Sequence, residues 1–233
     1  MYFINWERKI TTNLFGSNKV VVKKTKSFTN LRHFILIFCF TLISIFSGNP
    51  SSPPGIGQKI IENESFEFRN KLKSMGISTP KLFSISYDEI IEEYIKGGNL
   101  YFYFSTKTAH DLAFQAGKIT GLLHKKGFVF IDNKCQNFLV NKDKEVIRID
   151  LGLIQKTETV FAQSMDVGSF LASILDLNPQ IYRKVAKGFL SGYLQITSKK
   201  IPYLSIILRN ILALGFVYNH DNMIKNMVNK RIA

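Results

Sequence analysis

The segment from residue 128 to residue 152, FVFIDNKCQNFLVNKDKEVIRIDLG, constrains the chain more than any other part of it. Asp132, Lys134 and Asn137 form the pattern D-x-K-x-x-N between two apolar runs. Asp150 opens an Asp-Leu-Gly triplet directly after a third apolar run. Short apolar runs bounded by polar turns indicate strands. The sequence therefore predicts three short strands whose connecting loops carry these polar side chains.

These residue types suit phosphoryl transfer assisted by a divalent metal. Mg²⁺ prefers hard oxygen ligands, and the Asn137 amide and the Asp150 carboxylate supply two while leaving positions for phosphate oxygens and water. Asp132 can accept or orient the proton of an attacking hydroxyl. Lys134 can offset the negative charge that spreads over a phosphoryl group in flight. We predict Asp132 and Lys134 as catalytic residues and Asn137 and Asp150 as metal ligands.

The order and spacing of these residues resemble the catalytic loop (H-R-D-x-K-x-x-N) and the D-F-G motif of protein kinases. The resemblance implies ATP and Mg²⁺ as cofactors, with Mn²⁺ as an alternative metal. It also implies an α+β, two-lobed fold with a reduced β N-lobe and a helical C-lobe that lacks a full activation segment. The expected N-lobe, residues 1–96, holds a short sheet, an apolar insertion helix over 33–47 and a glutamate-bearing helix. The expected C-lobe is 97–233.

The same resemblance assigns the residues that would bind the nucleotide. Lys23 ends a β-branched run and resembles the strand lysine that holds the α- and β-phosphates, with Lys24 as the alternative register. Glu67 is the expected ion-pair partner of this lysine, and Glu64, one turn away, is the alternative.

Two further stretches fit the kinase pattern. Glu93 and Ile95 precede a Gly-Gly pair and resemble the hinge, where backbone groups would read adenine. His124 precedes the catalytic loop and is expected to be structural. Asp166 resembles the buried aspartate that ties a helix to that loop.

Three departures from the kinase pattern narrow the kind of kinase that the chain can resemble. No glycine-rich loop precedes Lys23, where only Gly16 is found. Asp166 follows Gly152 by fourteen positions, too few for a long activation loop, so a conventional peptide substrate is not expected. Phe130 stands where the family has histidine, and this loss should loosen Asp150.

The shortened pattern, over about residues 60–195, resembles three related groups: the kinase subunit of the KEOPS tRNA-modification complex, the RIO kinases, and the lipopolysaccharide-core sugar kinases for heptose and Kdo. The elements 76–80 (GISTP) and 188–193 (GFLSGY) favour the first group. The apolar run 34–46 and the basic charge suit the last. The main expectation is a kinase acting on a protein hydroxyl, on itself or on a sugar-lipid. The alternatives are a pseudokinase scaffold and an ATPase subunit of a tRNA-modification complex.

Charge and composition bear on partners and location. The formal charge of +14 favours an anionic partner, either a sugar-lipid at a membrane surface or a tRNA complex, although a merely solvated basic face remains an alternative. Two isolated cysteines predict a reducing compartment and no disulfide partner. The run 34–46 is shorter than a membrane span, so a buried or interfacial helix is expected, with a short anchor as the alternative. We expect a cytoplasmic protein, with association at the cytoplasmic membrane face left open.

Overall fold

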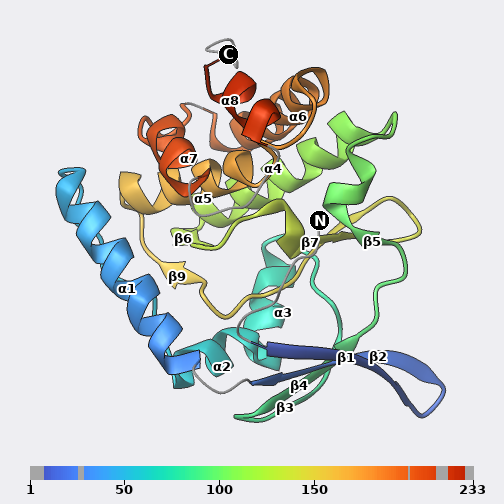
Figure 1. Ribbon diagram of the computed structural model, residues 1–233. Coiled ribbons are helices and arrows are strands. Elements are labelled where there is room, and N and C mark those ends of the chain that lie inside the picture. Colours follow the sequence, from blue (N-terminus) through green and yellow to red (C-terminus); the bar gives the residue numbers. More distant parts are fainter. Residues whose placement is uncertain (1–7, 26–28, 199, 214–219, 229–233) are drawn as a thin grey trace.

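The computed structural model describes residues 8–25, 29–198, 200–213 and 220–228 (Figure 1). The fold is α+β, with small antiparallel sheets and, over these residues, eight α-helices. The strands are β1 (Arg8–Phe15), β2 (Asn18–Thr25), β3 (Leu82–Ile85), β4 (Glu89–Glu93), β5 (Gly98–Asn99), β6 (Phe128–Val129), β7 (Phe138–Val140), β8 (Val146–Arg148) and β9 (Gln155–Lys156). The helices are α1 (Thr29–Phe46), α2 (Gln58–Glu64), α3 (Phe66–Ser74), α4 (Ala109–Lys125), α5 (Val160–Ala172), α6 (Pro179–Thr197), α7 (Ser205–Ala213) and α8 (His220–Val228).

The largest sheet has the strand order β1-β2-β4-β3, and all its neighbouring strands are antiparallel. β1 and β2 form an antiparallel hairpin, and they meet at a turn where Gly16 has a φ of 60°. β-branched residues favour strands because they pack on a pleated, half-buried surface. Val20 and Val22 are accordingly buried in β2. Because side chains alternate along a strand, Lys23 and Val22 lie on opposite faces.

The expected glutamate-bearing helix is two helices, α2 and α3, separated at Ser65. Ser65 has extended dihedral angles (φ −65°, ψ 163°), and its hydroxyl accepts a hydrogen bond from the backbone N–H of Phe68 at 3.2 Å. A serine in this position caps the second helix. The break turns Glu64, at the end of α2, into the protein interior, where it is fully buried.

Two small sheets carry the predicted loop residues. One has the order β5-β7-β8, and the other pairs β6 with β9. The chain enters the first sheet through Gly97, where a Cβ atom would lie only 1.9 Å from the carbonyl oxygen of Val140. A glycine is therefore required there, and the Gly-Gly pair read as a hinge is explained by this close backbone approach.

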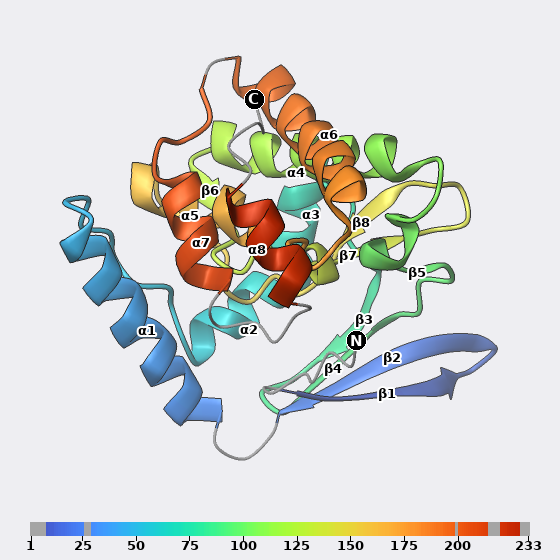
Figure 2. The ribbon, with the colours of Figure 1, turned by 45° about the horizontal axis from the view of Figure 1, so that its top comes forward.

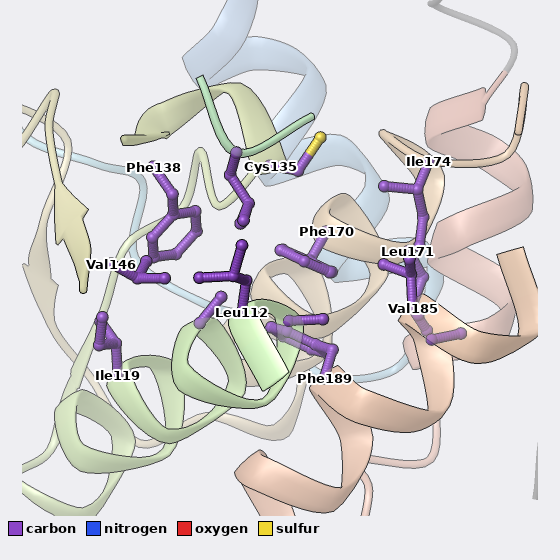
Figure 3. Packing of buried hydrophobic residues seen from close by; sticks show 14 of the residues in the cluster. Leu112, Ile119, Cys135, Phe138, Val146, Phe170, Leu171, Ile174, Val185 and Phe189 are labelled. Carbon is purple, nitrogen blue, oxygen red and sulfur yellow. The ribbon is translucent and has the colours of Figure 1, made fainter. Parts of the chain in front are cut away.

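The main core lies between α4, α5, α6 and the β7–β8 pair, as the packed side chains in Figure 3 show. Phe170 of α5 and Phe189 of α6 stack with their ring centroids 3.9 Å apart. α4 and α6 approach closely through glycines. A Cβ at Gly117 would lie 1.9 Å from the oxygen of Phe189, and one at Gly192 would lie 2.0 Å from the oxygen of Phe114.

Helix α1 lies at the edge of the molecule beside α5 and α7 (Figures 1 and 2). On its inner side Phe40 is buried and packs edge-on against Phe161 of α5, with ring centroids 5.0 Å apart. The segment after α1 is tied to the start of α5, where the hydroxyls of Ser51 and Thr159 lie 2.9 Å apart. Within the described ranges, no helix is both long and apolar enough to cross a bilayer.

Candidate functional site

The site centres on Lys23 of β2, whose side chain is 3% exposed. Its ammonium nitrogen lies 2.7 Å from Glu92 Oε1 and 3.1 Å from Asp150 Oδ1. Strand pairing explains the first contact, because Glu92 on β4 is a diagonal neighbour of Lys23 on one face of the sheet. Lys24, the alternative register, points to solvent and pairs with Glu89. The lysine of this site is therefore Lys23.

The pKa values of Lys23 and Asp150 are both shifted by their neighbours, and the shifts favour the charged form of each group. Burial alone would lower the pKa of Lys23, but the carboxylates of Asp150, Glu92 and Glu64 raise it above its ordinary value. Burial alone would raise the pKa of Asp150, but the charges of Lys23 and Arg8 hold it well below its ordinary value. Asp150 is thus anionic and Lys23 cationic at any physiological pH.

The prediction that Glu67, on the helix after Lys23, forms an ion pair with this lysine needs correction. Glu67 is exposed in the first turn of α3 and does not form the ion pair with Lys23. Glu64, the alternative, is fully buried, and its Oε1 accepts a hydrogen bond from the backbone N–H of Leu151 at 3.0 Å. The break at Ser65 causes the difference, because helical periodicity cannot be carried across it.

A second buried cation completes this carboxylate cluster. Arg69 of α3 donates from Nη2 to Glu64 at 2.7 Å and to Glu92 at 2.8 Å, and from Nη1 to the carbonyl of Pro80 at 2.7 Å. Arginine suits this position because its planar fork reaches several oxygens at once. Arg69 and Lys23 therefore share Glu92 between them. Sequence reasoning missed Glu92 and Arg69, since neither stands in a motif.

The predicted catalytic loop brings three side chains together. Asp132 Oδ2 accepts from Asn137 Nδ2 at 3.0 Å and lies 2.8 Å from Lys134 Nζ. Asn137 also donates to the carbonyl of Asp132 at 2.8 Å. About a third of the Asp132 and Lys134 side chains is exposed, so both reach solvent. The loop thus presents a carboxylate and an ammonium group to an incoming ligand.

The predicted catalytic loop is anchored by the buried side chain of Asp166 on α5. Its carboxylate accepts from the backbone N–H groups of Phe130 at 2.6 Å and Ile131 at 2.7 Å, and from His124 Nε2 at 2.9 Å. Ile131 has a φ of 66°, a strained value for a β-branched residue that this anchoring holds in place. His124 is buried between Asp166 and Tyr193 and therefore has a structural position.

Arg148, at the end of β8, was not singled out from the sequence. It is fully buried, and its guanidinium lies 4.1 Å from the ring centroid of Phe130. Nη2 donates to the carbonyl of Asp132 at 2.8 Å and reaches that of Asp150 at 3.5 Å. Burial lowers its pKa to about 10, which leaves it charged at neutral pH. Arg148 thus joins the two aspartate-bearing segments beside Phe130.

The donors at Asp150 fit a magnesium ion. The Asp150 carboxylate is a third exposed, and Asn137 uses its amide nitrogen toward Asp132, which leaves an amide oxygen as a second hard donor. Over the described residues, no three His, Cys, Asp or Glu side chains gather as a metal cluster. Two protein ligands with phosphate oxygens and water make up the kind of set that Mg²⁺ takes.

The two hinge residues lie at the end of the large sheet. Glu93 ends β4 with an exposed side chain, which accepts from the backbone N–H of Lys81 at 3.1 Å, and the N–H of Glu93 itself donates to the Lys81 carbonyl at 2.8 Å. Ile95 is buried two residues later. The side chain of Glu93 is therefore turned away from the site, and any contact with a nucleotide there involves the backbone.

No known protein-family model matches the chain. The chain is 27% identical over 124 residues to a "probable bifunctional tRNA threonylcarbamoyladenosine biosynthesis protein" of Methanocaldococcus jannaschii, a match covering 52% of this chain and 22% of that protein. Proteins of the same name match from Methanoculleus marisnigri (29% over 118 residues, 51% and 21% covered) and Methanococcus maripaludis (28% over 137 residues, 54% and 23% covered). These relatives are tRNA-modification proteins.

The chain spans about a fifth of the length of these relatives. Of the three kinase groups that the sequence resembles, the comparisons support the tRNA-modification group and not the RIO or lipopolysaccharide kinases.

Proposed function

We propose that this chain is the Mg-ATP-using subunit of an assembly that forms threonylcarbamoyladenosine in tRNA, and that it cleaves the γ-phosphate of ATP at the Lys23–Asp150 site. The observation that carries the proposal is the buried Lys23 ammonium 3.1 Å from Asp150, beside a loop that presents Asp132, Lys134 and Asn137. The names of the relatives supply the tRNA context. In this proposal the fold is two-lobed and kinase-like, with residues 1–96 as the N-lobe and 97–233 as the C-lobe.

Each side chain has a defined part in the proposed reaction. Lys23, held by Glu92, would direct its charge at the α- and β-phosphates, and Asn137 and Asp150 would hold the metal. When bound, Mg-ATP supplies the phosphoryl group and the charge of the ion. Asp132 orients the attacking oxygen and takes its proton, and Lys134 offsets the negative charge that develops on the moving group. The backbone near Glu93 and Ile95 borders the adenine.

Water is the acceptor that we favour. The thirteen residues between Gly152 and Asp166 hold β9 and the start of α5, with no extended platform for a peptide. Asp132 is open to solvent, as a group that orients a water molecule must be. Phosphorylation of a protein hydroxyl, on this chain or a partner, is the second candidate. A sugar-lipid acceptor has no support from the relatives.

The test is ATP turnover by the purified chain with Mg²⁺, without an added acceptor. We expect phosphate release that falls by about 100-fold or more in Asp132→Asn, because proton transfer is lost. Asp150→Asn should lose turnover together with the Mg²⁺ dependence of nucleotide binding. Asp143→Asn, on an exposed turn, is the matched control and should leave the rate unchanged.

A comparison of ATP binding by the Lys23→Met and Lys24→Met variants tests which lysine contacts the nucleotide. Only the first should weaken ATP binding, because Lys24 points to solvent and pairs with Glu89. Wild-type rates in both Asp132→Asn and Asp150→Asn would contradict the site assignment. Nucleotide binding without turnover, or no binding at all, would instead favour the pseudokinase scaffold. Transfer of the phosphate to protein in place of its release as inorganic phosphate would favour the kinase.

A further inference from the structure

The outer face of α1 is apolar along the described part of the helix. Phe34, Phe38 and Phe46 are 63%, 57% and 82% exposed, and three aliphatic side chains between and beside them are also exposed: Ile35, Leu42 and Ile45. No charged residue occurs from 34 to 46. Soluble monomers rarely leave a contiguous apolar patch of more than a few hundred Å² in water, so a surface of this kind marks an interaction site.

The spacing of the exposed residues indicates what covers them. Ile35, Phe38, Leu42 and Ile45 follow each other at intervals of three, four and three, which is the a/d spacing of a helix that packs against another helix. Phe40 and Ser44 are on the opposite, buried side, where Phe40 packs against Phe161 of α5 and the Ser44 hydroxyl accepts a hydrogen bond from the backbone N–H of Ser51 at 3.3 Å. The seam therefore lies along the middle of the outward face, where a second helix with the same spacing would fit.

We propose that this face binds the α1 helix of a second copy of the chain, so that the protein is a two-fold symmetric dimer with paired α1 helices. A second copy supplies the same uncharged a/d seam, and a two-fold interface brings identical patches together. The charge of +14 opposes association through most of the surface. Because residues 34–46 carry no charge, two copies that meet through this stretch bring no like charges together. Electrostatic repulsion between the copies is therefore weakest at this face.

The size of the face is that of a stable interface. With about 150–250 Å² for each fully covered aromatic side chain, Phe34, Phe38 and Phe46 offer about 300–500 Å² at their observed exposures of 63%, 57% and 82%. Tyr203, 67% exposed, lies near the C-terminal end of α1, where its hydroxyl accepts a hydrogen bond from Asn49 at 2.9 Å. With the three aliphatic residues, the face approaches the about 800 Å² per partner of a standard interface.

A lipid surface is the other occupant to be tested. Interfacial helices usually carry lysine and arginine on a polar side that faces water. The side of α1 opposite the seam is instead buried against α5, and the described stretch 34–46 contains no lysine or arginine. These features favour a protein helix over an anionic bilayer.

The experiment is light scattering on the full chain, at about 1–100 μM, to cover dimers of micromolar affinity. Dimer formation requires neither nucleotide nor metal, so both are left out. We expect twice the chain mass of 26.7 kDa for the wild type and for Leu14→Glu, which lies on the exposed hairpin of β1 and β2. Leu42→Glu and Ile45→Glu should be monomeric, because they place paired charges inside the seam.

Crosslinking supplies a second measurement that does not depend on a variant's folding. Cys39 is exposed one residue from the midpoint of the seam, so the thiols of two copies lie at nearly the same height. Cys135 is buried and does not compete. A short bismaleimide should join two wild-type chains but not two Cys39→Ser chains. A monomeric wild type, a Leu14→Glu variant as dissociated as Leu42→Glu, or a monomer that sediments with anionic vesicles would each overturn the dimer.

Discussion

At the scale of single residues, Arg148 lies against Phe130, which stands where the kinase pattern has histidine. The loss of the histidine was expected to loosen Asp150. The buried guanidinium instead lies over the Phe130 ring and joins the carbonyls of Asp132 and Asp150. The Arg148 guanidinium stacks on the Phe130 ring and donates to the two carbonyls, so it links the segments that carry Asp132 and Asp150.

We therefore expect Arg148→Met to lower the free energy of unfolding by about 2 kcal/mol, because buried acceptors lose a charged donor. ATP turnover should fall further than this loss explains, since Asp132 and Asp150 would no longer be held together. Arg148→Lys should rescue little, because an ammonium group lacks the planar fork. Denaturant unfolding and turnover measure both effects. Arg183→Met, exposed on α6, is the matched control, and equal losses in the two variants would contradict this role.

The sequence predicted the loop residues of the site better than their buried supports. Asp132, Lys134 and Asn137 lie within six positions, so local spacing alone brings them together. Glu92 meets Lys23 only because β2 pairs with β4 in one register, and a sequence does not display the register of distant strands. Neither Glu67 nor Glu64 forms the predicted ion pair with Lys23, which pairs with Glu92 instead, and Ser65 interrupts the helix between the two glutamates.

At the scale of elements, the fit of α4 against α6 depends on glycines. The three short strands of the segment 128–152 were predictable, because apolar runs bounded by polar turns determine them locally. The glycines of the stretch 188–193 were noticed only as a resemblance. Their physical reason is the close backbone approach at Gly117 and Gly192, which becomes visible when the two helices are packed together.

Gly192→Ala should therefore destabilise the protein by about 1–3 kcal/mol, because its Cβ would lie 2.0 Å from the Phe114 oxygen and force the helices apart. In an exposed helix the same change usually stabilises by up to about 1 kcal/mol, so the sign of the effect is diagnostic. Chemical denaturation followed by circular dichroism gives the number. Lys187→Ala on the exposed side of α6 controls for helix propensity, and a stabilised Gly192→Ala variant would show that the helices can separate freely.

At the scale of the whole molecule, the excess of 31 Lys and Arg over 17 Asp and Glu gives a basic surface that favours anionic partners. Exposed cations include those on α6: Arg183, Lys184 and Lys187. Contacts of such groups with phosphates release counterions, so binding depends steeply on salt.

If tRNA is the partner, we expect its affinity to fall by about 10³–10⁵ between about 50 and 200 mM salt, the range for six to ten phosphate contacts. Filter binding or fluorescence anisotropy with a tRNA transcript gives the slope of affinity against salt. A polyanion without bases, such as heparin, should compete in the same range. Affinity that is flat with salt would mean that the basic surface is only solvated.

The pairing of Lys23 with Glu92 has a consequence for regulation. Both residues belong to neighbouring strands of one sheet, so the lysine is set in place when the sheet folds. A catalytic lysine held by a mobile helix can be switched off when the helix swings away. Here no such movement separates Lys23 from its carboxylate. If the site binds nucleotide as proposed, Lys23 is in position once the sheet has folded, and we expect control of this protein to come from outside the chain, through the supply of nucleotide or the arrival of a partner.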